Sequence, residues 1–146
     1  AEQYMADSLH HCSGVDEYMR RTVEEAREKG YAETIFGRRR YLPELASGNF
    51  NMRSFGERVA RNMPIQGAAA DIIKIAMIRV DERLRREGLQ ARLILQVHDE
   101  LIVECPEEEA ERVSALLTGE MESAVSLSVP MVAEAKVGRT WYEAKA

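Results

Sequence analysis

The stretch LILQVHDELIVEC, residues 93–105, decides the fold of this chain. Two apolar arms rich in leucine, isoleucine and valine flank the polar triplet His98, Asp99 and Glu100. Apolar arms that contain β-branched residues, joined by a short polar centre, are typical of a tight antiparallel hairpin. We therefore predict a hairpin of two well-buried strands that presents His98, Asp99 and Glu100 at its tip.

The carboxylates at this tip have two interpretations. A carboxylate at the end of two buried strands is held in a fixed position, which a divalent metal ion requires of its ligands. Aspartate is also a common turn former, so the triplet could simply reverse the chain. Adjacent residues of a strand point to opposite faces, so Asp99 and Glu100 are poorly placed to share one ion. Glu104 and Glu134 are not expected at this tip, and a metal site built on Asp99 is predicted to be half of a site.

The composition is that of a globular chain. With 146 residues, 45% of them hydrophobic, the chain can form one domain or part of a larger one. It has no apolar run of transmembrane length and no signal peptide, so we expect a soluble, cytoplasmic protein. The two cysteines, Cys12 and Cys105, have no metal-type spacing and are expected to be free thiols.

Charge is unevenly distributed along the chain. The net charge is −5, but residues 31–62 hold six arginines against three glutamates, and residues 97–146 hold four basic residues against eleven acidic ones. A basic band beside an acidic remainder is typical of a protein that touches phosphate along one surface only. Windows this short also fluctuate by chance, so a random scatter of solvated charge remains an alternative. The arginines of the band are Arg38, Arg39, Arg40, Arg53, Arg58 and Arg61.

Hydrophobic periodicity and chain breakers predict an α+β fold. The first half is expected to contain the end of an element with helical spacing around Tyr4, Met5 and Leu9, a helix that follows Ser13-Gly14 and ends in a left-handed cap at Gly30, a small hairpin of residues 31–36 and 39–42, and a loop over 44–52. Helices over 54–62 and about 66–86, the central hairpin, a helix from 107 and a last strand over 130–137 should follow. Pro64 should separate the two middle helices, because it cannot donate to a helical ladder and biases Met63 toward an extended conformation. The second of them should be central and largely buried, with Asp71 and Asp81 as cap or surface groups.

A second group of polar residues, Arg58, Asn62 and Gln66, precedes and follows Pro64. Four-residue spacing places Arg58 and Asn62 on one helix face, with Gln66 just beyond the proline. Their side chains are rich in donors, and both A·T and G·C pairs display acceptors at the minor-groove edge, so donors there can check duplex shape without reading sequence. Alternatively, Asn62 and Gln66 end and start helices, and Arg58 is simply solvated.

Taken together, four segments resemble the C-terminal part of the polymerase domain in the bacterial DNA polymerase I family, the family A DNA polymerases. The segments are FGRRRYLPEL (residues 36–45), ERVARNMPIQGAAADIIKIAM (57–77), QVHDEL (96–101) and VPMVAEAKVGRTW (129–141). The resemblance extends over nearly the whole chain in ordered blocks. It implies a palm-type antiparallel sheet with the hairpin tipped by residues 98–100, with residues 1–62 as fingers-side helices and a small hairpin and residues 63–146 as palm.

The resemblance also implies roles for single residues. Asp99 matches a catalytic aspartate that binds the Mg²⁺ pair of the family, and Glu100 matches the neighbouring acid in a supporting role. His98 resembles the residue that approaches the primer terminus. The donors Arg58, Asn62 and Gln66 match positions that contact the duplex minor groove and the template. The implied partners are primer-template DNA and deoxynucleoside triphosphates, and the implied reaction is template-directed nucleotidyl transfer with two Mg²⁺ ions.

Several parts of that family pattern are absent from these 146 residues. The first catalytic aspartate, in a DYSQIELR-like motif, is missing, as are the lysine- and arginine-bearing fingers helix, the thumb and any exonuclease domain. We therefore expect the chain alone to be inactive and to self-associate through exposed apolar surface. A non-catalytic duplex-binding module is the alternative. A His-Asp metal phosphohydrolase is a poorer one, because the only histidines, His10, His11 and His98, lack ligand spacing to another carboxylate.

Overall fold

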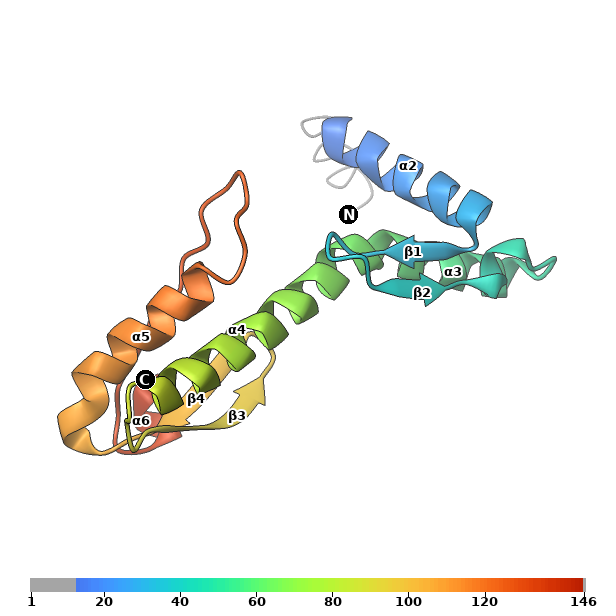
Figure 1. Ribbon diagram of the computed structural model, residues 1–146. Helices are drawn as coiled ribbons and strands as arrows, with labels where there is room; N and C mark the ends of the chain where they lie inside the picture. The colour runs from blue at the N-terminus through green and yellow to red at the C-terminus, as the bar shows by residue number, and fades with distance from the viewer. Residues whose placement is uncertain (1–12, 146) are drawn as a thin grey trace. The chain divides into compact units, whose positions relative to one another are not determined.

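The structure of the protein, a computed structural model, describes residues 13–145 (Figure 1). The helix end expected around Tyr4, Met5 and Leu9 lies outside the described residues, as do two histidines and Cys12. The described chain forms two compact units, one ending at Ala68 and the other beginning at Ala69. Among the helices of the described residues, none combines the length and the apolar composition needed to cross a bilayer.

The first unit contains α2, a small hairpin and α3. Its elements are α2 (Ser13–Lys29), β1 (Tyr31–Glu33), β2 (Arg39–Tyr41), the 3₁₀ turn η1 (Pro43–Ala46), α3 (Phe50–Asn62) and the π-helical turn η2 (Met63–Gly67). Gly30, with φ +80°, ends α2 as predicted, and its carbonyl accepts from the amide of Leu42 at 2.9 Å. The buried core of this unit is Val23, Ala26, Ala32, Leu42, Leu45, Ala60 and Met63.

Two local predictions for this unit are wrong. Helix α3 begins at Phe50 and not at Ser54, because the side chain of Asn49 accepts hydrogen bonds from the amides of Asn51 and Met52 and so caps the helix. Met63 is helical, with φ −58° and ψ −45°, and is not extended before Pro64. The chain passes through the proline as a π turn, which needs no amide donor at that position.

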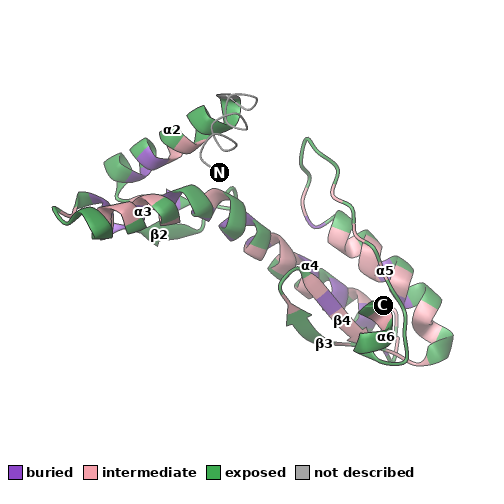
Figure 2. Ribbon diagram, turned by 180° about the vertical axis from the view of Figure 1, so that it is seen from behind, coloured by how far each residue is buried: buried purple, intermediate pink, exposed green. Residues whose placement is uncertain are grey.

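The second unit packs a hairpin and α5 with α4. Its elements are α4 (Ala68–Arg86), β3 (Arg92–Val97), β4 (Glu100–Glu104), η3 (Glu107–Glu109), α5 (Ala110–Glu122) and α6 (Trp141–Lys145), and Ala68 of α4 belongs to the first unit. The buried core is Ala76, Val80, Leu84, Ala91, Leu101, Val113, Leu116 and Ala124 (Figure 2). This mixed helix and strand content confirms the predicted α+β class.

The central hairpin is less buried than predicted. The register shifts by one residue between Leu93 and Leu95, so Ile94 is an extra residue in β3 and the alternation of faces breaks there. Ile94 is 55% exposed and Leu95 is 43% exposed, whereas Leu101 of β4 is buried in the core. Helix α4 is likewise only partly buried, with Ile78 60% exposed, and Asp71, expected as a cap or surface group, is buried.

The expected third strand, residues 130–137, is absent from the described residues. Over residues 131–135 the side chains alternate in burial as a strand's would: Met131, Ala133 and Ala135 are half-buried, and Val132 and Glu134 between them are exposed. Val137, predicted to lie on the same face as Met131, is 66% exposed. The backbone pairs with neither strand of the hairpin, since the sheet contains β3 and β4 alone. Residues 131–135 therefore have the predicted alternation without the interstrand hydrogen bonds that define a strand.

Candidate functional site

The tip of the β3–β4 hairpin is a two-residue turn made of His98 and Asp99. Val97 pairs with Glu100 across it. His98 has φ +52° and is the non-glycine residue with positive φ in the described chain, a conformation that costs an L-residue about 1–2 kcal/mol. The side-chain amide of Gln96 donates to the carbonyl of His98 at 2.5 Å. The turn is therefore held by a side-chain hydrogen bond as well as by the ladder.

The two acids at this tip differ in their contacts. The carboxylate of Glu100 pairs with the Lys145 ammonium at 3.4 Å. Asp99 is exposed, and within residues 13–145 no hydrogen bond or ion pair engages its side chain. Asp99 is thus the carboxylate that is available to a ligand at the tip.

The described residues do not complete a metal centre around Asp99. Nowhere in the described chain do three His, Cys, Asp or Glu side chains gather closely enough to hold an ion. Mg²⁺ requires near-octahedral oxygen coordination, so one free carboxylate beside a paired one does not satisfy it. The metal site on Asp99 therefore stays a prediction.

The donors Arg58, Asn62 and Gln66 lie in the first unit on α3 and η2. All three are exposed, and in the part of the chain that the structure describes no hydrogen bond or ion pair occupies their side chains. Arg58 and Asn62 are four residues apart in one α-helix and share a face. The structure thus keeps three donor-rich side chains free along a continuous helical path, and we refer to them as the donor row.

The π turn that carries Gln66 is the part of this site that sequence reasoning missed. Met63 and Gly67 of the turn are buried, whereas Gln66 between them is exposed. π turns within α-helices are rare and often occur at functional sites. The one signal in the sequence was Pro64 inside an otherwise helical pattern, which we interpreted as a break.

The basic band is only partly available to a ligand. Arg39 pairs with Glu33 at 2.7 Å and lies 4.5 Å from the centre of the Tyr31 ring. Arg53 donates to the carbonyl of Ser47 at 3.0 Å. Several arginines of the band therefore stabilise their own unit, and the count of charges overstates the free cationic surface.

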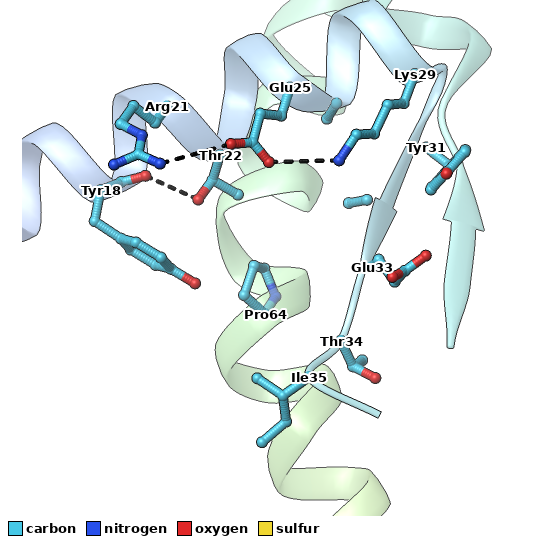
Figure 3. Close-up of a pocket in the computed structure, with 12 residues that line it drawn as sticks. Tyr18, Arg21, Thr22, Glu25, Lys29, Tyr31, Glu33, Thr34, Ile35 and Pro64 are labelled. Atoms are coloured by element: carbon cyan, nitrogen blue, oxygen red, sulfur yellow. Dashed lines mark hydrogen bonds and ion pairs between the residues drawn. The ribbon is translucent and has the colours of Figure 1, made fainter. Parts of the chain in front are cut away.

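A cavity of about 250 Å³ lies between α2, the β1–β2 hairpin and Pro64 (Figure 3). Its two cations, Arg21 and Lys29, are both near Glu25, at 3.9 and 3.6 Å. The hydroxyl of Thr22 donates to the carbonyl of Tyr18 at 2.8 Å. Both cations therefore pair with Glu25, and Glu33, the other acid that lines the cavity, pairs with Arg39. None of the predicted site residues lies there.

The comparisons with known proteins agree on one class of protein, the DNA polymerases. The chain is 59% identical over 132 residues to DNA polymerase I of Geobacillus stearothermophilus, covering 90% of this chain and 15% of that protein. It is 50% identical over 145 residues to DNA polymerase I of Streptococcus pneumoniae, covering 99% of this chain and 16% of that protein. A solved structure of the POL domain of Pol1 from M. smegmatis, in complex with DNA primer-template and dNTP, matches with a TM-score of 0.85 and 47% identity, covering 88% of this chain and 23% of that one.

The family model for DNA polymerase family A matches residues 1–143. The chain belongs to DNA polymerase family A, which confirms the resemblance drawn from its sequence blocks. It spans about 15% of the length of the curated relatives that it matches.

Proposed function

We propose that this chain is the part of a DNA-directed DNA polymerase that supplies one metal-binding carboxylate and the minor-groove contacts of the polymerase site. Asp99 is the proposed metal ligand and catalytic residue, Glu100 supports it, and His98 approaches the primer terminus. The observation that carries this proposal is the exposed, unpaired carboxylate of Asp99 on a turn fixed by Gln96. Family membership supports the same assignment.

The donor row supplies the second half of the proposal. Arg58, Asn62 and Gln66 present free donors, and acceptors occur at the minor-groove edge of every base pair. Contacts of this kind would test the width and alignment of the duplex without selecting its sequence. The matched structure holds primer-template DNA and dNTP, which makes these the proposed partners of a protein containing this chain.

Family A DNA polymerases generally use divalent metal ions, and two Mg²⁺ ions are the proposed cofactors here. Bound Mg²⁺ would stabilise charge on the oxygens of the transferred phosphoryl group. Asp99 contributes one ligand in this proposal. Since the described residues hold no complete site, we propose that the 146-residue chain alone does not extend primers.

A chimera tests the proposed function. The matching segment of Geobacillus stearothermophilus DNA polymerase I would be replaced by this chain, and primer extension would be measured with Mg²⁺ and all four triphosphates. We expect extension that is lost in Asp99→Asn and kept in Glu104→Gln, an acid at the far end of β4. The proposed role of Asp99 fails if the Asp99→Asn chimera, folded by circular dichroism, extends primers at the parental rate. Extension by the isolated chain would overturn the proposed inactivity.

A non-catalytic duplex-binding module is the second candidate, and the free donor row favours it. For this function we expect the isolated chain to bind duplex DNA with an affinity that falls steeply with salt. Undetectable binding at low salt would remove this candidate. A cytoplasmic location and self-association through exposed apolar side chains are further proposals, and sedimentation as a monomer at high concentration would contradict the latter.

A further inference from the structure

The π turn that carries Gln66 contacts the β1–β2 hairpin of the same unit. The guanidinium of Arg38 donates from Nη2 to the carbonyl of Gly67 at 3.1 Å. Gly67 directly follows Gln66, and its carbonyl belongs to the peptide that joins it to Ala68, so this hydrogen bond holds the backbone one residue beyond that donor. A hydrogen bond from a charged guanidinium is stronger than one from a neutral donor, so the Gly67 carbonyl has a strong partner outside the helix.

Steric contact with the hairpin also restrains the backbone at Gly67. A Cβ atom added to Gly67 would lie 2.7 Å from Cγ2 of Thr34 and 3.1 Å from Sδ of Met63. Thr34 is only 4% exposed, so it has little room to withdraw. Glycine is therefore required at position 67 by the close approach of the hairpin. Figure 3 draws Thr34 and Pro64, one from each of these two elements, at the wall of the cavity.

The hairpin side of the contact is itself ordered. The hydroxyl oxygen of Thr34 accepts from the amides of Phe36 and Arg38, at 3.2 and 3.3 Å. The amide of Thr34 donates to the carbonyl of Arg38 at 3.0 Å, and Gly37 takes a φ of +81° between them. These hydrogen bonds hold the backbone of Arg38 in place, and its guanidinium extends from there to the carbonyl of Gly67.

We propose that Arg38, with Thr34 and Gly67, forms a clamp that positions Gln66 in the donor row. The inference rests on the proposed function, in which Gln66 contacts the minor groove. Arg38 acts through the Gly67 peptide and is a positioning residue. It makes no contact with nucleic acid in this proposal, although it lies in the basic band.

Hydrogen exchange of the 146-residue chain tests the clamp itself. In Arg38→Met we expect the amides of residues 66–68 to exchange about tenfold faster, as loss of a hydrogen bond from a charged donor predicts. Arg39→Met is the matched control, because Arg39 pairs with Glu33 and does not reach the π turn. Unchanged exchange at residues 66–68 in Arg38→Met would overturn the proposal.

A pair of compensating substitutions tests the steric contact of the proposed clamp. Gly67→Ala should speed exchange at the same amides, because its new methyl group meets Cγ2 of Thr34. Thr34→Ser removes that carbon and keeps the hydroxyl, so Thr34→Ser with Gly67→Ala should restore exchange toward the parental rate. A double variant as perturbed as Gly67→Ala alone would show that Thr34 is not the contact that sets the turn.

Binding to a fluorescent primer-template duplex separates positioning from direct contact. If Arg38 acts through Gln66, then Arg38→Met and Gln66→Ala weaken binding by similar factors, the double variant is no weaker than Gln66→Ala, and the salt dependence is unchanged. A phosphate contact by Arg38 would instead give additive losses and a salt slope smaller by about one, which would overturn the proposal. If the parental chain binds no duplex, the duplex-binding function of the isolated chain fails, and the exchange measurements still decide the clamp.

Discussion

Glu109 is expected to stabilise the second unit through two specific hydrogen bonds. Its Oε1 accepts from the amide of Gln90 and its Oε2 from the amide of Ala91, each at 3.0 Å. The carboxylate thereby ties the start of α5 to the residues that lead into β3. An acidic residue at a helix N-terminus can also stabilise the helix by complementing its macrodipole, which would be a different role for Glu109.

Glu109→Gln distinguishes the two roles by its magnitude. The variant keeps the shape and one acceptor oxygen, but it turns an NH₂ group toward an amide donor. Loss of one charge-assisted hydrogen bond beside the buried Ala91, with its amide left unsatisfied, should cost about 2–3 kcal/mol. A macrodipole contribution alone is worth about 0.3–1 kcal/mol and should be nearly the same for Glu108→Gln, the matched control.

Urea unfolding of the 146-residue chain measures this difference. The chain has one tryptophan, Trp141, and it lies in the second unit, so its fluorescence reports on that unit. We expect Glu109→Gln to lower the free energy of unfolding by at least about 1.5 kcal/mol more than Glu108→Gln does, with faster amide exchange at Ala91. Equal losses in the two variants would refute the hydrogen-bond role and leave the macrodipole as the reason for the acid.

Three further predictions concern the same unit. Leu84→Ala should lower the free energy of unfolding in urea by about 2–5 kcal/mol, because Leu84 is 2% exposed. Ile78→Ala should lower it by less than about 1 kcal/mol, because Ile78 is 60% exposed. Similar losses in the two variants would contradict the described core. The hydrogen bond from Arg83 holds the pKa of Glu87 below its ordinary value of 4.5, so the contribution of this pair to stability is present above that pH and is lost as the pH falls below it. Glu87→Gln should therefore flatten the fall of the melting midpoint below pH 4.5, and an unchanged profile would be contrary evidence. Burial raises the pKa of the Cys105 thiol above its ordinary value of 9.0. In a variant whose other cysteine is replaced by serine, the alkylation rate of the folded chain should therefore have a higher pH midpoint than that of the urea-unfolded chain. Coincident midpoints would contradict the raised pKa.

The order of elements up to α5 was predictable because it depends on local periodicity and on chain breakers, whereas the predicted last strand is absent from the described residues. The helix up to Gly30, the small hairpin and the central hairpin all occur where their patterns predict them. The extra residue at Ile94 was not predictable, because a bulge depends on how two strands pair and leaves both apolar patterns intact. The burial of Asp71 was likewise missed, since its spacing on α4 does not reveal which groups pack against that position.

Pro64 illustrates how a correct local rule can give a wrong structure. The proline does remove an amide donor, and the helix does change there, but the chain widens into a π turn and remains helical. The carbonyl of Gly67 accepts a hydrogen bond from Arg38, in a hairpin about thirty residues earlier in the chain. Such a partner has no signature at position 64, so only the three-dimensional structure distinguishes a π turn from a break.

In the candidate site, the sequence identifies residues by their chemistry, whereas only the structure shows whether their side chains are free to bind a ligand. Sequence patterns selected Arg58 and Asp99 by chemistry and spacing, and the structure adds that both side chains are exposed and unoccupied among the described residues. The patterns weighted all six arginines of the basic band alike, although Arg38 bonds to a π-turn carbonyl and Arg39 to a glutamate on the facing strand. An arginine already held in this way must give up a charge-assisted hydrogen bond before it can bind phosphate. Free donors, and not the local sum of charge, should therefore determine which residues of the band weaken duplex binding when they are replaced.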